Sequence, residues 1–306
     1  MKLYYADHFV LPLPEGHRFP IEKYARLRSR LLTCGAFAET DFCVPDAASD
    51  EALLRAHDGG YLQRMASGTL DAAEVRRIGF PWSTAMVERS RRSTGATIAA
   101  CRSALARDGG TACAVNLAGG THHAHRDFGS GFCVFNDAAT AALAMRAEGR
   151  VRRVAIVDCD VHQGDGTAAI LADEPDVFTC SLHGAKNFPF RKQISDLDVE
   201  LPDDTGDVAY LTALDEALQS VFGRARPELV IYLAGADPYS GDRLGRLALS
   251  IDGLRQRDER VLAACRDANV PVAIAMAGGY AEPIDDTVTI HFNTVTTAAR
   301  LLRDRA

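Results

Sequence analysis

Two carboxylates and an imidazole stand at alternating positions after a short apolar run. Residues 154–157 are apolar, and Asp158, Asp160 and His162 follow them. On an extended backbone alternate side chains point to the same side, so these three would share one face. Such a group can bind a divalent metal or set up proton transfer. The alternative is a strand that simply ends in acidic residues, but the density of polar residues and the Gly-Asp-Gly segment at 164–166 favour a site.

Chemically useful side chains also follow three other apolar runs. His122 and His123 follow the first, Asp237 follows the second, and Tyr280, in a Gly-Gly-Tyr segment, follows the third. Taken singly, adjacent histidines are commonly a surface pair, a lone Asp is commonly a helix cap, and Gly-Gly-Tyr is commonly a turn. Ligand sites of parallel sheets lie beyond the carboxyl ends of the strands, so four such ends can surround one pocket.

The apolar runs are short, apolar on both faces and separated by helical patterns. This is typical of a mostly parallel sheet that is covered on both sides. We therefore expect an α/β protein with a single three-layer α/β/α domain over residues 1–306. The expected strands are 2–5, 111–116, 154–158, 177–181, 229–233 and 272–276. The expected helices are 21–32, 50–57, 61–66, 84–106, 136–148, 167–172, 210–222, 251–269 and 291–302.

Local signals refine these elements. Asn136 is expected to cap the helix that follows it, and the strand at 154–158 is expected to end at or just after Asp158. Gly59 and Gly60 are expected to separate two short helices, and the charged stretch 71–80 is expected to be a surface loop. The loops expected to shape the pocket rim are 11–20, 71–82 and 184–196.

Composition and charge narrow the class of protein. The 306 residues carry 34 Lys and Arg against 41 Asp and Glu, a formal net charge of −7. This charge argues against a nucleic-acid binder and suits a cationic small molecule or a basic peptide as substrate. The eight cysteines contain no CxxC pair, and no uncharged apolar run reaches ~18 residues. Without a signal-peptide core at the N-terminus, we expect a cytoplasmic protein with no membrane association.

Four motifs resemble those of a known superfamily, in its order and with its spacing. They read GGTHHAHRDFGSGFCVFNDAA, DCDVHQGDGT, LAGADPYSGDRLG and AGGY, between about residues 113 and 280. These motifs resemble the histone deacetylase and acetylpolyamine/acetoin-type deacetylase superfamily, which has the arginase-like fold. Gln163 stands where class I and II members commonly have a second histidine. In this respect the chain resembles the class IV branch and its bacterial relatives.

The resemblance implies a set of metal ligands. Asp160, His162 and Asp237 match the zinc ligands of the family, and two carboxylates with one imidazole leave coordination positions open for water and a substrate carbonyl. This oxygen-rich set would also suit Fe(II) or Co(II). A structural potassium site is implied as well, formed around Asp158, Asp160, His162, Ser181 and Leu182.

The resemblance also assigns catalytic roles. His123 matches the general acid/base and His122 its electrostatic partner, with Asp158 behind His122 and Asp165 behind His123. Tyr280 matches the tyrosine that polarises the carbonyl and stabilises the oxyanion. The residues expected to contact the substrate are Gly131, Phe132, Phe188, Leu244 and Gly279. The remaining histidines, expected to be structural, are His8, His17, His57, His125, His183 and His291.

The resulting hypothesis is a metal-dependent amidohydrolase that removes an acetyl or longer acyl group from an amine. The expected substrate is an acylated lysine in a peptide or protein, or a small acylated amine such as an acetylpolyamine. An arginase-like ureohydrolase is an alternative, but Pro238 and Tyr239 offer no second ligand beside Asp237. A non-catalytic module that binds acyl-lysine is another alternative, which the intact histidine pair and Tyr280 disfavour.

Overall fold

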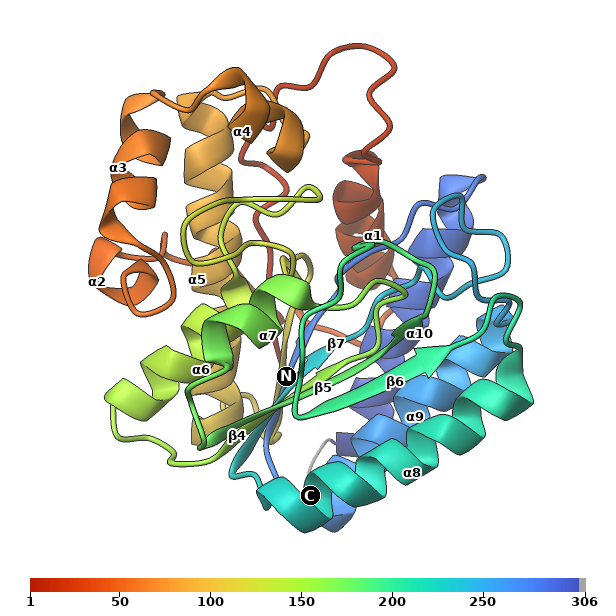
Figure 1. The fold of residues 1–306 in the computed structure, drawn as a ribbon. Helices are drawn as coiled ribbons and strands as arrows, with labels where there is room; N and C mark the ends of the chain where they lie inside the picture. Colours follow the sequence, from red (N-terminus) through yellow and green to blue (C-terminus); the bar gives the residue numbers. More distant parts are fainter. Residues whose placement is uncertain (303–306) are drawn as a thin grey trace.

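The central strands are apolar almost to their carboxyl ends because both faces of the sheet are covered. β4 (Val154–Asp158), β7 (Leu229–Leu233) and β8 (Val272–Ala275) are buried at every residue. The computed structural model describes residues 1–302 (Figure 1). All eight strands form one parallel sheet in the order β2-β1-β3-β8-β7-β4-β5-β6. The other strands are β1 (Lys2–Tyr4), β2 (Phe42–Cys43), β3 (Cys113–Asn116), β5 (Val177–Gly184) and β6 (Leu197–Leu201).

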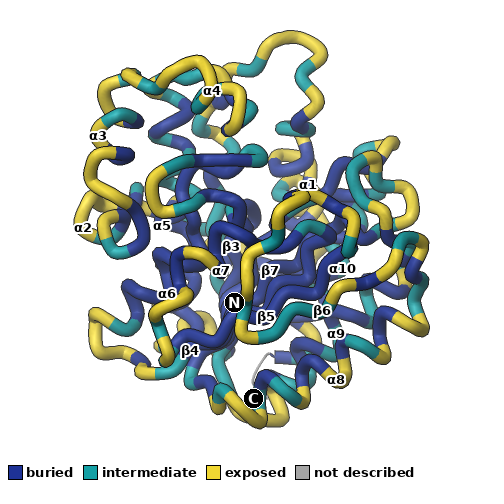
Figure 2. The backbone as a smooth tube through the Cα atoms, in the orientation of Figure 1, coloured by how far each residue is buried: buried dark blue, intermediate teal, exposed yellow. Residues whose placement is uncertain are grey.

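Alternate residues of each strand pack against different helical layers. In β4, Val154 and Ile156 lie in one hydrophobic cluster, while Ala155 and Val157 lie in the other. The first layer contains α2 (Asp50–Leu53), α3 (Gly59–Ser67), α4 (Ala72–Ile78), α5 (Thr84–Ala106), α6 (Asp137–Ala147) and α7 (Asp165–Leu171). The second contains α1 (Glu22–Thr33), α8 (Asp207–Ala225), α9 (Ile251–Asp267) and α10 (Ile284–Leu302). The two layers lie on opposite sides of the sheet, and the buried residues are concentrated between them (Figures 1 and 2).

Several sequence-based expectations are confirmed. The three-layer α/β/α architecture is present, and α5 has the expected bounds. Asn136 caps α6, because its Oδ1 accepts a hydrogen bond from the backbone N–H of Ala139 at 2.9 Å. β4 ends at Asp158, where the polar residues begin.

The expected surface loop at 71–80 is wrong, because this stretch contains α4. Asp71 caps the helix and Glu74 completes a capping box, while Ile78 is buried against the core. Arg76 and Arg77 are exposed, and the helix is too short to show a clear apolar periodicity in the sequence.

Other boundaries also differ from the expectation. Gly59 and Gly60 do not separate two helices but form the first turn of α3, because the side chain of Asp58 accepts hydrogen bonds from Gly60 and Tyr61. The final helix begins at Ile284 rather than at residue 291. The short strand β2 and the half-exposed edge strand β6 were not expected. Within residues 1–302, no helix is long and apolar enough to cross a membrane.

Candidate active site

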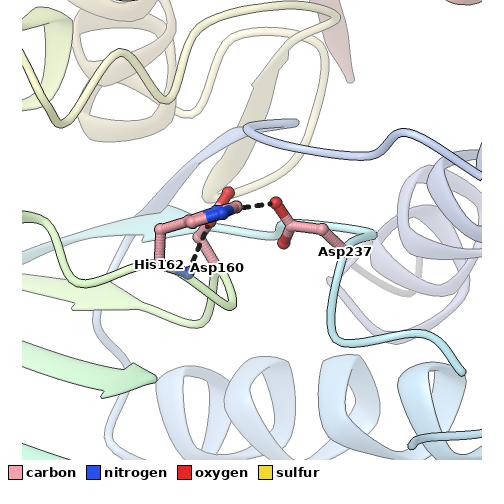
Figure 3. Close-up of side chains that lie close together, drawn as sticks. All are labelled: Asp160, His162 and Asp237. Carbon is pink, nitrogen blue, oxygen red and sulfur yellow. Dashed lines mark hydrogen bonds and ion pairs between the residues drawn. The ribbon is translucent and has the colours of Figure 1, made fainter. Parts of the chain in front are cut away.

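Asp160, His162 and Asp237 converge beyond the carboxyl ends of β4 and β7. Their ligand atoms lie within 4.8 Å of one another, and Figure 3 shows the side chains of His162 and Asp160 facing that of Asp237. His162 Nδ1 lies 2.9 Å from Asp160 Oδ1 and 3.3 Å from Asp237 Oδ2. No other group of three or more His, Cys, Asp or Glu side chains converges this closely within residues 1–302. The described residues therefore contain one such group of ligand side chains, whereas a two-metal ureohydrolase would need a second group beside it.

Backbone N–H groups fix the orientation of the two carboxylates. Asp160 accepts hydrogen bonds from His162 N at 2.9 Å and from Gly278 N at 2.8 Å. Asp237 Oδ1 accepts a hydrogen bond from Val161 N at 2.9 Å. After β4 the chain therefore curls around the carboxylates instead of continuing as an extended strand, which is why Asp158 and Asp160 face different partners.

The three side chains fit a divalent cation. Asp237 Oδ2 is buried and accepts no hydrogen bond, a rare and costly state for a carboxylate oxygen. Burial lowers the pKa of His162, but the carboxylates of Asp160 and Asp237 outweigh burial and raise it to about 10. Burial and the charge of Asp160 raise the pKa of Asp237 to about 7. Both shifts show that the two carboxylates favour a positive charge at this point, which a divalent metal would supply.

The tandem histidines are each paired with a separate carboxylate. His122 Nδ1 lies 2.6 Å from Asp158 Oδ2, and His123 Nδ1 lies 2.6 Å from Asp165 Oδ1. A carboxylate at Nδ1 holds the proton on that nitrogen and leaves Nε2 for other partners. All four side chains are buried.

The environments of the two histidines separate their pKa values. Burial lowers the pKa of His122, but the charges of Asp158 and Asp160 raise it to about 9. Burial and the adjacent charge of His122 lower the pKa of His123 to about 4, despite the hydrogen bond to Asp165. At neutral pH His123 is therefore neutral and able to accept a proton, while His122 carries a positive charge. Such divergent pairs are characteristic of acid/base catalysis.

Tyr280 lines the same cavity from the turn after β8. Its backbone N–H donates to Asp242 Oδ2 at 2.6 Å, and its carbonyl accepts from Arg243 Nε at 3.1 Å. Burial, followed by the charges of Asp237 and Asp160, raises the pKa of Tyr280 well above its ordinary value, so its hydroxyl stays protonated. The buried Lys23 supports this turn from behind by donating hydrogen bonds to the carbonyls of Ala277 and Gly279.

The cavity has a volume of about 760 Å³ and includes most of the residues expected to contact substrate. Gly131, Phe132, Phe188 and Leu244 all line it. The Phe188 ring packs edge-on against His123, with 4.9 Å between ring centroids. A Cβ on Gly131 would lie 2.7 Å from the His123 ring and 3.3 Å from Phe188, so only glycine fits here. Gly279 does not line the cavity.

The residues of the expected potassium site lie on adjacent strands. Asp158 and Ser181 are register partners across β4 and β5, and Leu182 follows on β5. All three are buried. Ser181 Oγ lies 3.0 Å from Nδ1 of His183, whose Nε2 is buried without a hydrogen-bond partner.

Several positioning residues were missed by sequence reasoning. His125, expected to be structural, lies 3.0 Å from Asp165 Oδ2 through its Nε2, so two histidines share that carboxylate. The fully buried Arg257 donates to the carbonyls of Cys159 and Gly235, tying together the loops that carry the two metal-site carboxylates. The histidine repeat of residues 122–125 could have indicated that His125 belongs to the site. Arg257 lies in an ordinary helical pattern, so no sequence signal indicated its role.

Gln163 anchors the loop between β5 and β6. Its Nε2 donates to Gln193 O at 2.7 Å and to Asp198 Oδ1 at 2.8 Å, and its Oε1 accepts from Gln193 N at 2.8 Å. Phe188 lies on this loop, so Gln163 fixes one wall of the cavity from the metal-site side.

Comparison with known proteins defines the class to which this fold and site belong. A model of the histone deacetylase domain matches residues 17–295. An uncharacterized protein of Picosynechococcus is 44% identical, over 94% of each chain. A histone deacetylase-like amidohydrolase of Pseudomonas aeruginosa is 34% identical, over 89% of this chain and 74% of the relative. The chain belongs to the histone deacetylase family.

Solved structures agree with this fold. An acetylpolyamine aminohydrolase from Burkholderia pseudomallei superposes with a TM-score of 0.80, covering 98% of this chain and 99% of its own, at 22% sequence identity. At this identity the likeness concerns the fold, and substrate preference has to be argued from the residues of this chain.

Proposed function

We propose that this protein is a metal-dependent deacylase that hydrolyses the amide of an acylated lysine side chain or a related small amine. The observation that carries the proposal is the convergence of the Asp160–His162–Asp237 group and the His122–His123 pair on one cavity. Zn²⁺ is the ion we expect, with Fe²⁺ or Co²⁺ as alternatives for this ligand set. When bound, the metal would act as a Lewis acid on the substrate carbonyl and lower the pKa of water.

The protein side chains would then handle the protons and the developing charge. Neutral His123 accepts a proton from the attacking water and later donates it to the leaving amine nitrogen, while Asp165 holds the imidazole in orientation. The imidazole of His122, held by Asp158, would stabilise negative charge that develops beside it. The protonated hydroxyl of Tyr280 donates a hydrogen bond to the carbonyl oxygen as it becomes an oxyanion. Phe132 and Phe188 offer flat apolar walls for a methylene chain.

A substrate panel tests this proposal. We expect zinc-loaded protein to hydrolyse acetyl-lysine peptides and to lose this activity on chelation or in Asp160→Ala. Tyr280→Phe should lower kcat by about 10²–10³-fold with little change in KM, because it removes one oxyanion donor. Hydrolysis that persists after complete metal removal, or at an undiminished rate in Asp160→Ala, would refute the proposal. Octanoyl- and myristoyl-lysine peptides and acetylated polyamines in the same panel define the acyl and amine preferences.

Three further expectations accompany the proposal. The buried, register-paired Asp158 and Ser181 support a structural potassium site at the start of the metal loop. All eight cysteines are unpaired, which favours a reducing compartment and supports a cytoplasmic location. The expected relation to the class IV branch depends on Gln163, which stands where class I and II members commonly have a histidine.

A further inference from the structure

The mouth of the cavity carries a charge opposite to that of the whole chain. Besides the buried Lys23, five exposed cationic side chains line the cavity, whereas its only acidic lining residues within 1–302 are Asp160 and Asp237 of the metal site. The five are Arg18, Arg77, Lys186, Arg243 and Arg246. The formal net charge of the chain is −7. The surface around the cavity is thus positive although the chain as a whole is negative.

Arg18 and Arg77 contact aromatic rings and pair with no carboxylate among residues 1–302. The Arg18 guanidinium lies 5.4 Å from the centroid of Phe132, and that of Arg77 lies 4.5 Å from the centroid of Phe128. Both residues are exposed. The loop before α1 and the helix α4, which carry these arginines, meet where His17 Nε2 lies 3.0 Å from the carbonyl of Gly79. These two unpaired charges therefore lie at the rim, the ring of exposed cationic residues around the cavity mouth, where they can attract an anion.

The other three cations share two carboxylates. Arg246 and Lys186 both contact Asp203, at 3.2 and 3.5 Å. Arg243 lies 3.4 Å from Glu282, whose side chain is 77% exposed, and its Nε is held by the carbonyl of Tyr280. The rim as a whole keeps an excess of positive charge after these ion pairs are counted.

An acylated lysine side chain is itself neutral, so the rim cannot act on the group that enters the cavity. It acts on the charges that flank that group. Neighbouring carboxylates are attracted by the rim, whereas the free ammonium groups of an acetylpolyamine are repelled by it. Resting on the proposed deacylase function, we propose that the substrate class is acyl-lysine within acidic peptide sequences, recognised by the arginines and lysine of the cavity mouth. This reverses the sequence-based expectation of a basic peptide or a cationic small molecule.

Three acetyl-lysine peptides of equal length test the proposal, with two Asp, two Ser or two Lys residues on each side of the acetyl-lysine. We expect kcat/KM at low ionic strength to be at least about 10-fold higher for the Asp peptide than for the Lys peptide. The ratio should fall severalfold in 0.5 M NaCl, because salt screens exposed charges over a few ångströms. Arg18→Gln/Arg77→Gln removes both unpaired charges and should lower the ratio severalfold.

Arg266→Gln is the matched control. Arg266 is exposed, pairs with the adjacent Asp267, and lies near the end of α9 that leads into the start of β8, away from the carboxyl ends of the strands. It should leave the Asp-to-Lys ratio unchanged. A ratio near one, a preference for the Lys peptide or an acetylated polyamine, or a ratio that survives in the double variant would overturn the proposal.

The Ser peptide separates this inference from the function on which it rests. If the Ser peptide is hydrolysed but the ratio does not favour Asp, the deacylase function stands and the charge preference is refuted. If no peptide is hydrolysed, the deacylase function on acetyl-lysine peptides is refuted. The affinities of fluorescent versions of the three peptides, measured by anisotropy, then decide the charge preference: tighter binding of the Asp peptide supports it, and equal or weaker binding overturns it.

Discussion

His57 connects two segments that position the catalytic histidines. Its Nε2 accepts a hydrogen bond from the backbone N–H of Asn136 at 2.9 Å, and its Nδ1 lies 2.9 Å from the carbonyl of His125. The Asn136 side chain in turn donates to the carbonyl of His122 and to that of Ala124. Only the neutral imidazole with its proton on Nδ1 satisfies both bonds. Burial lowers the pKa of His57 from 6.5 to about 4.

This shift makes the free energy of unfolding depend on pH. Between pH 6.5 and 4 the unfolded chain binds a proton at His57 that the folded protein does not, so stability falls as pH falls. The stabilisation from neutral His57 is fully present above pH 6.5. A difference between 6.5 and about 4 corresponds to about 3 kcal/mol, lost across this window. Protonation of Nε2 would also break the bond to Asn136 and loosen the loop of His122 and His123.

His57→Gln removes the titrating ring and keeps a polar side chain. We expect the stability advantage of the wild type over this variant to shrink by about 2–3 kcal/mol between pH 7.5 and 4.5. Urea unfolding followed by the fluorescence of the single tryptophan, Trp82, in the presence of a chelator, measures this difference without a contribution from metal binding. His8→Gln controls for the loss of an exposed imidazole. Parallel pH profiles for the wild type and His57→Gln would refute the reasoning.

Three other predictions concern the site directly. Added Zn²⁺ at about 100 times its Kd should stabilise the wild type by about 3 kcal/mol, and a thermal shift of the same size in Asp237→Asn would contradict the assigned ligand. Gln163→Leu removes three hydrogen bonds to the β5–β6 region, so it should raise KM severalfold and speed amide hydrogen exchange over residues 186–194. Unchanged exchange would argue against an anchoring role for Gln163. Asp165 raises the pKa of His123, so Asp165→Asn should reduce kcat/KM by about 10–100-fold and move the acidic limb of the pH–rate profile to lower pH. A limb that stays at the wild-type position would show that Asp165 does not set the pKa of the catalytic base.

The buried elements could be predicted from the sequence because their signals are strong. β4 and β7 are uninterrupted apolar runs, and Asn136 stands directly before an alanine-rich helix. The segments that were missed have weaker signals. β6 is half exposed at the sheet edge, and α4 is a seven-residue helix whose clearest mark was the capping pair of Asp71 and Glu74.

The site could be predicted only where residues lie near one another in sequence or match a motif. The alternation of Asp158, Asp160 and His162 predicted a site, whereas the placement of Asp158 behind His122 came from the family resemblance. The cationic rim could not be predicted from the sequence for a different reason. Arg18, Arg77 and Arg243 come from distant segments, and only the folded chain brings them to one mouth.

The order of strands has a consequence for synthesis of the chain. β8 is the last strand to be made, yet it lies between β3 and β7 and is the element that joins the two parts of the sheet. A nascent chain that ends before Val272 leaves the edges of β3 and β7 without their partner strand and does not yet contain Tyr280. Folding of the sheet is therefore completed after translation of β8. Until that point the growing protein depends on protection of these edges against aggregation.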